Sequence, residues 1–78
     1  MTIDKNGIIM NKFKDRLNEL LKEKDISQSD LRKQLNFSKN QVHYWTKGKA
    51  EPSLDDLIAI ADFFGVCTNY LLGQQDVY

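Results

Sequence analysis

Hydrophobic residues recur at helical spacing along most of the chain, and no segment alternates between apolar and polar residues as a half-buried strand would. Phe13, Leu17, Leu20 and Leu21 stand at positions i, i+4, i+7 and i+8 and would share one apolar stripe. They predict a first helix over about residues 11–24. The whole pattern predicts an all-α protein with few strands.

Three serines mark the starts of further helices. Ser27, Ser38 and Ser53 each precede an Asp or Gln by three residues, which is the spacing of an N-terminal cap. The helix after Ser53 is predicted to end at Gly65, and a last short helix, at about residues 67–72, is predicted to end at Gly73. We expect the helix after Ser53 to bury Leu54, Leu57, Ile58, Ala61 and Phe64.

Residues 27–49 (SQSDLRKQLNFSKNQVHYWTKGK) carry the most informative pattern. Two helices of about eight residues are separated by Asn36 and Phe37 alone, so the second must leave the first at a steep angle, as in a helix-turn-helix. Asn36 suits this turn because, after glycine, asparagine best tolerates a positive φ.

The second of these helices has two different faces. Val42 and Trp45 fall on one side, which is typical of a core face. Asn40, His43 and Lys47 fall on the opposite side, together with Tyr44. That second side is a hydrogen-bonding surface without an acid, as a helix entering the DNA major groove requires.

The chemistry of these polar residues suits DNA. Asparagine can pair with adenine and lysine with guanine, while glutamine, histidine and tyrosine can bond bases or phosphates. We expect four residues to read bases: Lys39, Asn40, His43 and Tyr44. We expect five others to contact the DNA backbone: Gln28, Ser38, Gln41, Lys47 and Lys49.

Charge distribution agrees with this placement, although the formal net charge of the 78 residues is zero. Residues 31–50 hold five basic side chains and no acid, whereas residues 51–78 hold five acids and no basic side chain. A short basic block is commonly just solvated surface, but it is also what phosphate binding requires. Charge alone does not decide between the two.

A series of short motifs follows this order along the chain: SQSDL, LNFS, QV, W and GK, then PSLDDL, IADFFGV and NYLLG. Together these motifs resemble the phage-repressor and Cro type of helix-turn-helix domain, the XRE family. The resemblance covers roughly Asn11 to Gly73. It implies a compact five-helix bundle, a double-stranded DNA operator as partner, and a homodimer, at least on DNA. It places Gln28, Lys39, Asn40 and Tyr44 at positions that touch DNA directly in relatives, and Gln41, Lys47 and Lys49 at backbone-contacting positions.

One departure from the family pattern concerns the packing of the two motif helices. Arg32 stands where the family typically has a small alanine beneath the second helix. Its stem must therefore extend outward, or the two helices must splay.

We expect residues 1–10 to form a mobile extension, 11–73 the helix-turn-helix domain and 74–78 a tail. No separate ligand-sensing or oligomerisation domain is expected. If the chain dimerises, its apolar candidates are Tyr70, Leu71, Val77 and Tyr78. The longest apolar run spans only residues 57–61 and no signal-peptide layout is present, so we expect a cytoplasmic protein without a membrane segment.

Catalytic and metal chemistry find no support in the sequence. One cysteine (Cys67) excludes an intrachain disulfide, and together with one histidine (His43) it is too few for a zinc site. His43 has no nucleophile or carboxylate on its helix face. We expect no cofactor, no metal and no enzyme activity.

The resulting expectation is a sequence-specific DNA-binding transcriptional regulator, acting as a repressor through the helix at about residues 38–46. The alternative is a protein-binding antitoxin or anti-repressor module on the same scaffold, with which the acidic last third is compatible. The salt dependence of DNA binding separates the two.

Overall fold

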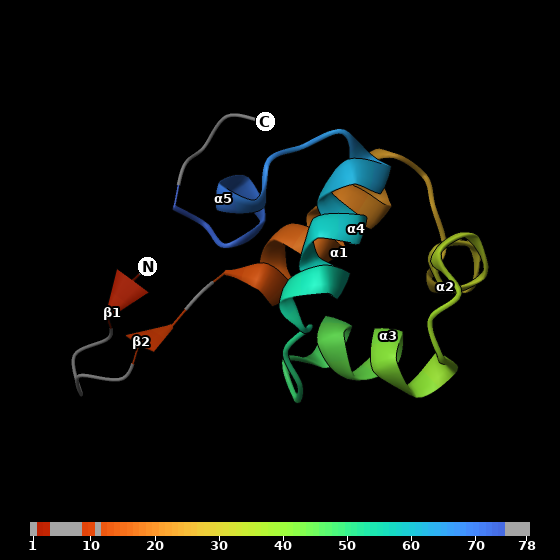
Figure 1. Cartoon of the computed structure of the whole chain (residues 1–78), viewed down its shortest axis with the longest axis horizontal. Helices are drawn as coiled ribbons and strands as arrows, with labels where there is room; N and C mark the ends of the chain where they lie inside the picture. Colours follow the sequence, from red (N-terminus) through yellow and green to blue (C-terminus); the bar gives the residue numbers. More distant parts are fainter. Residues whose placement is uncertain (1, 4–8, 11, 75–78) are drawn as a thin grey trace.

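The computed structural model describes residues 2–3, 9–10 and 12–74 (Figure 1). These residues form five helices: α1 (Phe13–Glu23), α2 (Gln28–Leu35), α3 (Lys39–Lys47), α4 (Leu54–Phe64) and α5 (Thr68–Leu71). Two strands of two residues, β1 (Thr2–Ile3) and β2 (Ile9–Met10), pair antiparallel with Thr2 opposite Met10. The predicted all-α fold with few strands is confirmed.

Local sequence explains where the helices begin. Ser27 and Ser38 each form a complete capping box at the start of α2 and α3, in which serine and the residue three positions on cap each other's backbone N–H. The Ser53 hydroxyl accepts a hydrogen bond of 3.2 Å from the backbone N–H of Asp56 at the start of α4. All three predicted helix starts are therefore confirmed.

The helices pack around α1. It contacts α3 and α5, while α2 packs on α3 and α4 packs on α5. In Figure 1, α1 and α4 lie at the centre, α2 is seen end-on, and α3 runs along the lower edge. The core includes the four residues of the predicted α1 stripe and the most deeply buried side chains of the other helices, among them Leu31, Val42, Trp45, Ile60 and Leu71.

The predicted core of α4 is wrong at two positions. Leu54 is 72% exposed and Ile58 is 44% exposed, whereas Leu57, Ala61 and Phe64 are buried as expected. Ile60, which the sequence did not single out, is fully buried. The α4 helix is apolar on more than one side, so its sequence does not show which side faces the core.

Two of the residues predicted as candidates for a dimer contact are not on the surface. Tyr70 and Leu71 are buried in the core of the domain, so neither offers a surface to a second copy. Val77 and Tyr78 lie outside the described residues, as do positions 1 and 4–8 of the predicted mobile extension and position 11 of the predicted domain. The predicted division into extension, domain and tail stays a prediction.

Candidate nucleic-acid interface

The predicted steep turn between α2 and α3 depends on Asn36. This residue has φ 59° and ψ 39°, the left-handed conformation, and it ends α2. The backbone N–H of Phe37 then donates to the carbonyl oxygen of Arg32 at 2.9 Å, which closes the turn. As a result α3 crosses α2 steeply and lies at the edge of the molecule (Figure 1).

The inner face of α3 anchors the helix to the domain. Val42 is buried, and Trp45 is 2% exposed. The Trp45 ring meets Phe37 edge-on, with ring centroids 4.8 Å apart, and meets Phe13 of α1 at 6.3 Å. Trp45 is thus part of the core, as predicted, and the aromatic contacts fix the rotation of α3 about its axis.

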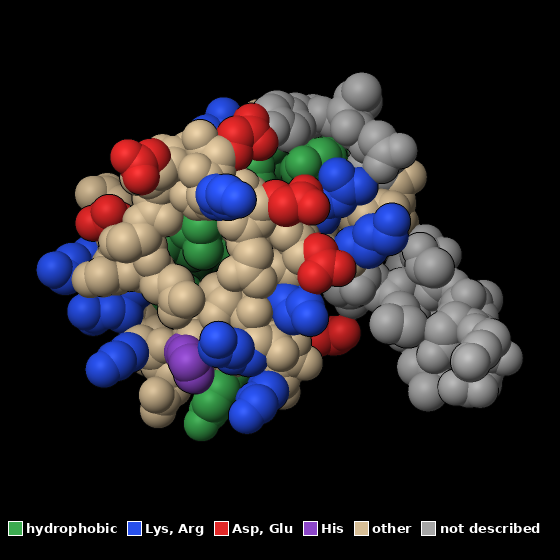
Figure 2. Space-filling view, turned by 180° about the vertical axis from the view of Figure 1, so that it is seen from behind, with side chains coloured by type: hydrophobic (Ala, Val, Ile, Leu, Met, Phe, Trp, Pro, Cys, Tyr) green, Lys and Arg blue, Asp and Glu red, His purple; other side chains and the backbone are tan. Residues whose placement is uncertain are grey.

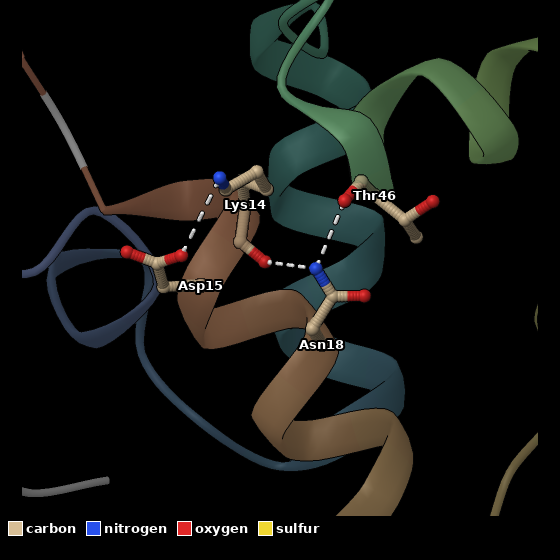
Figure 3. A network of polar contacts seen from close by, with 4 residues as sticks. All are labelled: Lys14, Asp15, Asn18 and Thr46. Carbon is tan, nitrogen blue, oxygen red and sulfur yellow. Dashed lines mark hydrogen bonds and ion pairs between the residues drawn. The ribbon is translucent and has the colours of Figure 1, made fainter.

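A second link joins α1 to the end of α3 (Figure 3). The side-chain amide of Asn18 donates to two backbone carbonyl oxygens, that of Lys14 in α1 and that of Thr46 in α3, each at 3.0 Å. Thr46 is itself buried, and its hydroxyl donates to the carbonyl oxygen of His43 at 2.8 Å. These bonds satisfy carbonyl groups in the last turn of α3 and hold this end against α1.

The outer face of α3 is open to solvent. Asn40, His43 and Lys47 are exposed, and Tyr44 is 44% exposed. The His43 and Tyr44 rings lie 5.9 Å apart with a tilt of 52°. Polar side chains with both donors and acceptors are therefore presented by one rigidly held helix, without an acid among them.

At the start of α3, two predicted backbone contacts also cap the helix. The Ser38 hydroxyl accepts from the backbone N–H of Gln41 at 3.1 Å, and the Gln41 side-chain oxygen accepts from the Ser38 N–H at 2.8 Å. Since the oxygen of the Gln41 amide is occupied, its NH₂ group keeps its two donors for a ligand. Both residues are exposed.

Residues of α2 and α3 meet in a hollow of about 350 Å³, lined by Gln28, Ser29, Arg32, Lys39 and Val42. The structure therefore brings Gln28, predicted to contact the DNA backbone, beside Lys39, predicted to read a base. Arg32 is half-buried in the same hollow, so its stem extends outward, while α2 and α3 remain packed.

The other end of α3 carries the two remaining predicted lysines. Gly48 ends the helix with φ 73°, and the backbone N–H of Lys49 donates to the carbonyl oxygen of Tyr44 at 2.9 Å. Lys47 lines a second hollow, of about 260 Å³, together with Lys14 and the carboxylates Asp15 and Glu51. The acid-free surface thus extends along α3 and ends at this hollow.

The basic and acidic segments of the sequence lie on different parts of the surface. Figure 2 shows basic side chains gathered around the histidine at the lower part of the molecule, while most acidic side chains lie above them or to the right. All five basic residues of positions 31–50 are exposed or half-buried in α2, α3 and the residues just after α3. A phosphate approaching the α3 face meets a positive surface although the chain is neutral.

Sequence reasoning missed the contact that Asn18 makes with α3 and the hollow that Arg32 lines. Asn18 is an exposed polar residue of α1, and nothing in its spacing signals a bond to another helix. Arg32 was recognised as unusual, but the spacing between it and Gln28 also placed both on one side of α2. That spacing was the signal for the shared hollow.

Comparison with known proteins agrees with this geometry. Residues 16–68 match the family described as Cro/C1-type HTH DNA-binding domain. The HTH-type transcriptional activator BcrR of Enterococcus faecalis is 31% identical over 65 residues, which are 83% of this chain and 32% of that protein. The HTH-type transcriptional regulator ImmR of Bacillus subtilis is 27% identical over 62 residues, which are 80% of this chain and 49% of that protein.

Two solved structures of transcriptional regulators have a fold similar to that of this chain. A transcriptional regulator from Listeria innocua superposes with a TM-score of 0.78 at 28% identity, covering 90% of this chain and 66% of the other. The SOS-response transcriptional repressor LexA from Eubacterium rectale gives a TM-score of 0.74 at 25% identity, covering 83% and 73% of the two chains. The chain spans about a third to a half of the curated relatives that it matches.

The residues matched to the family include all of α2, α3 and α4 and most of α1. Within the part of the chain that the structure describes, no helix is long and apolar enough to cross a membrane. The matched family is a DNA-binding domain, which is the non-enzymatic role expected for residues 16–68. The chain belongs to the family of Cro/C1-type helix-turn-helix DNA-binding domains.

Proposed function

We propose that this chain is a sequence-specific regulator that binds an operator by placing α3 in the major groove. The observation that carries the proposal is the outer face of α3, which is polar, exposed and acid-free, on a helix whose inner face is anchored in the core. A helix that is to read bases must be both accessible and fixed in orientation.

Four side chains of α3 are proposed to read bases. Asn40 is suited to a bidentate pair with adenine, and Lys39 to the acceptors of guanine. His43 and Tyr44 lie beside them on the exposed face and can donate or accept one bond each. Their common helix fixes their spacing along the groove.

The remaining residues are proposed to fix the register on the DNA backbone: Gln28, Ser38, Gln41, Lys47 and Lys49. Gln28 lies at the first turn of α2, Ser38 and Gln41 at the first turn of α3, and the two lysines at the far end of α3. The set therefore flanks the base-reading residues at both ends. Contacts at both ends fix the orientation of a recognition helix without reading sequence.

We further propose that two copies bind a two-fold symmetric operator, with half-sites about one helical turn apart. One relative is named an activator and a structural neighbour a repressor. For this chain we propose repression by occupying a promoter, because occlusion requires no property beyond DNA binding.

A titration of the whole chain against duplex DNA at several salt concentrations tests DNA binding itself. Affinity is expected to fall steeply between about 50 and 200 mM salt because bound phosphates displace counterions. Lys47→Ala is expected to weaken binding to all sequences alike and to lower the slope of log K against log salt by about 0.9 for each chain bound.

Lys12→Ala is the matched control, since Lys12 is exposed, its side chain lies beside Gly73 after α5, and it lines neither of the two hollows that α3 borders. It should leave the slope unchanged. Weak binding of the unaltered chain at every salt concentration would contradict DNA recognition and favour the protein-binding alternative. Equal slopes for the Lys47 and Lys12 variants would remove Lys47 from the contact set.

A further inference from the structure

Arg32 occupies a position that the set of proposed DNA contacts does not explain. It is half-buried and lines the hollow of about 350 Å³ between α2 and α3. Two of the five lining residues, Arg32 and Lys39, are cationic, and none is acidic. Two positively charged side chains, one from α2 and one from α3, therefore line the same hollow.

Helix geometry explains how the guanidinium reaches this place. Arg32 follows Gln28 by four residues, so the two side chains lie on one side of α2. Side chains on a helix tilt toward its N-terminus, which brings Arg32 over the turn that begins with Gln28. The buried Val42 lines the same hollow and offers apolar surface for the methylene stem of Arg32.

Within the described part of the chain, the guanidinium of Arg32 forms no hydrogen bond and no ion pair. The ammonium group of Lys39 likewise has none there. Two neighbouring cations without a counter-charge repel each other, so an anion in the hollow would relieve an unfavourable interaction as well as gain new bonds.

We propose that Arg32 binds a phosphate of the operator backbone in the hollow between α2 and α3. When the second helix of such a motif lies in the major groove, the first crosses the DNA backbone, so this face of α2 meets phosphate and not base edges. A guanidinium suits that ligand because its planar donors can bind two phosphate oxygens at once. This inference rests on the proposed function and adds a contact to it.

The test compares Arg32→Ala with Lys33→Ala in the whole chain, on an operator selected from random duplexes by the unaltered chain. Lys33 carries the same charge at the next position, is exposed, and does not line the hollow. We expect Arg32→Ala to weaken binding at the lower salt by about tenfold for each chain bound, and to lower the salt slope by about 0.9. Lys33→Ala should change the affinity and the salt slope much less than Arg32→Ala does.

Arg32→Ala is not expected to disturb folding, because among the described residues the charged end of this half-buried side chain has no hydrogen bond and no ion pair. The midpoint of thermal unfolding should remain the same or rise, and it is measured for both variants. An unchanged slope and affinity in Arg32→Ala would overturn the proposal, as would an equal loss in Lys33→Ala.

A changed preference at one base position in Arg32→Ala would also overturn it, since Arg32 would then read a base. Failure of the proposed function looks different. In that case the unaltered chain itself selects no operator and shows no salt-dependent binding.

Discussion

At the scale of single residues, Asn36 sets the direction in which α3 leaves α2. Its left-handed backbone conformation turns the chain between α2 and α3 within two residues. The sequence predicted this role because asparagine between two capped helices is one of few choices for a positive φ. The torsion angles confirm it.

Replacing Asn36 tests this conformational role. Asn36→Ala is expected to lower the free energy of unfolding by about 1 kcal/mol, because alanine adopts the left-handed region at a higher cost than asparagine. Asn36→Gly, the control, should be at least as stable as the unaltered chain, since glycine adopts the same angles without a Cβ clash. Urea unfolding followed by circular dichroism measures both. Equal stability of the alanine and glycine variants would contradict the argument.

The exposure of individual α3 residues could also be predicted, because the two most apolar residues of this helix show which of its sides faces the core. Once Val42 and Trp45 face inward, Asn40 and Tyr44 must face outward. The position of Arg32 could not be predicted in full. Whether its stem extends or the helices splay depends on how α2 and α3 pack, which is a property of two elements together.

At the scale of whole elements, helix starts were predicted well and the core face of α4 was not. A cap depends on residues three positions apart, so it can be recognised locally. The buried side of α4 depends on contacts with α5 and the rest of the core. Because α4 is apolar on several sides, its hydrophobic residues alone do not select one.

Two leucines of α4 make this difference measurable. Leu57 is buried, and Leu57→Ala is expected to destabilise the domain by about 2–4 kcal/mol through lost burial and a cavity. Leu54 is 72% exposed, so Leu54→Ala should cost less than about 0.5 kcal/mol. Chemical denaturation of both variants gives the comparison. Similar losses at the two positions would show that the α4 face is assigned wrongly.

At the scale of the whole molecule, the separation of basic from acidic residues could be predicted from the sequence. The contacts that fix the orientation of α3 could not. Residues 31–50 carry five basic side chains and no acid, and the fold places them on and around the two motif helices. The Asn18 amide that joins α1 to the last turn of α3 spans 28 positions of the chain. Local patterns carry no information about such a bond, although it fixes α3 within the domain.

The arrangement of two copies on DNA also belongs to this scale. Tyr70 and Leu71 are buried in the core, so the proposed dimer would have to use other residues for any contact between its two copies. Half-site spacing on the DNA reports the arrangement independently of which residues form that contact.

The central claim is that the outer face of α3 reads bases, and selection of bound duplexes from a random pool tests it most directly. The unaltered chain is predicted to enrich a two-fold symmetric site with half-sites about one helical turn apart. With Asn40→Ala, discrimination should weaken by about 1–3 kcal/mol, mainly at one position of each half-site, while the preference elsewhere persists. An Asn40→Ala variant that enriches the same site with undiminished preference at every position would contradict the account.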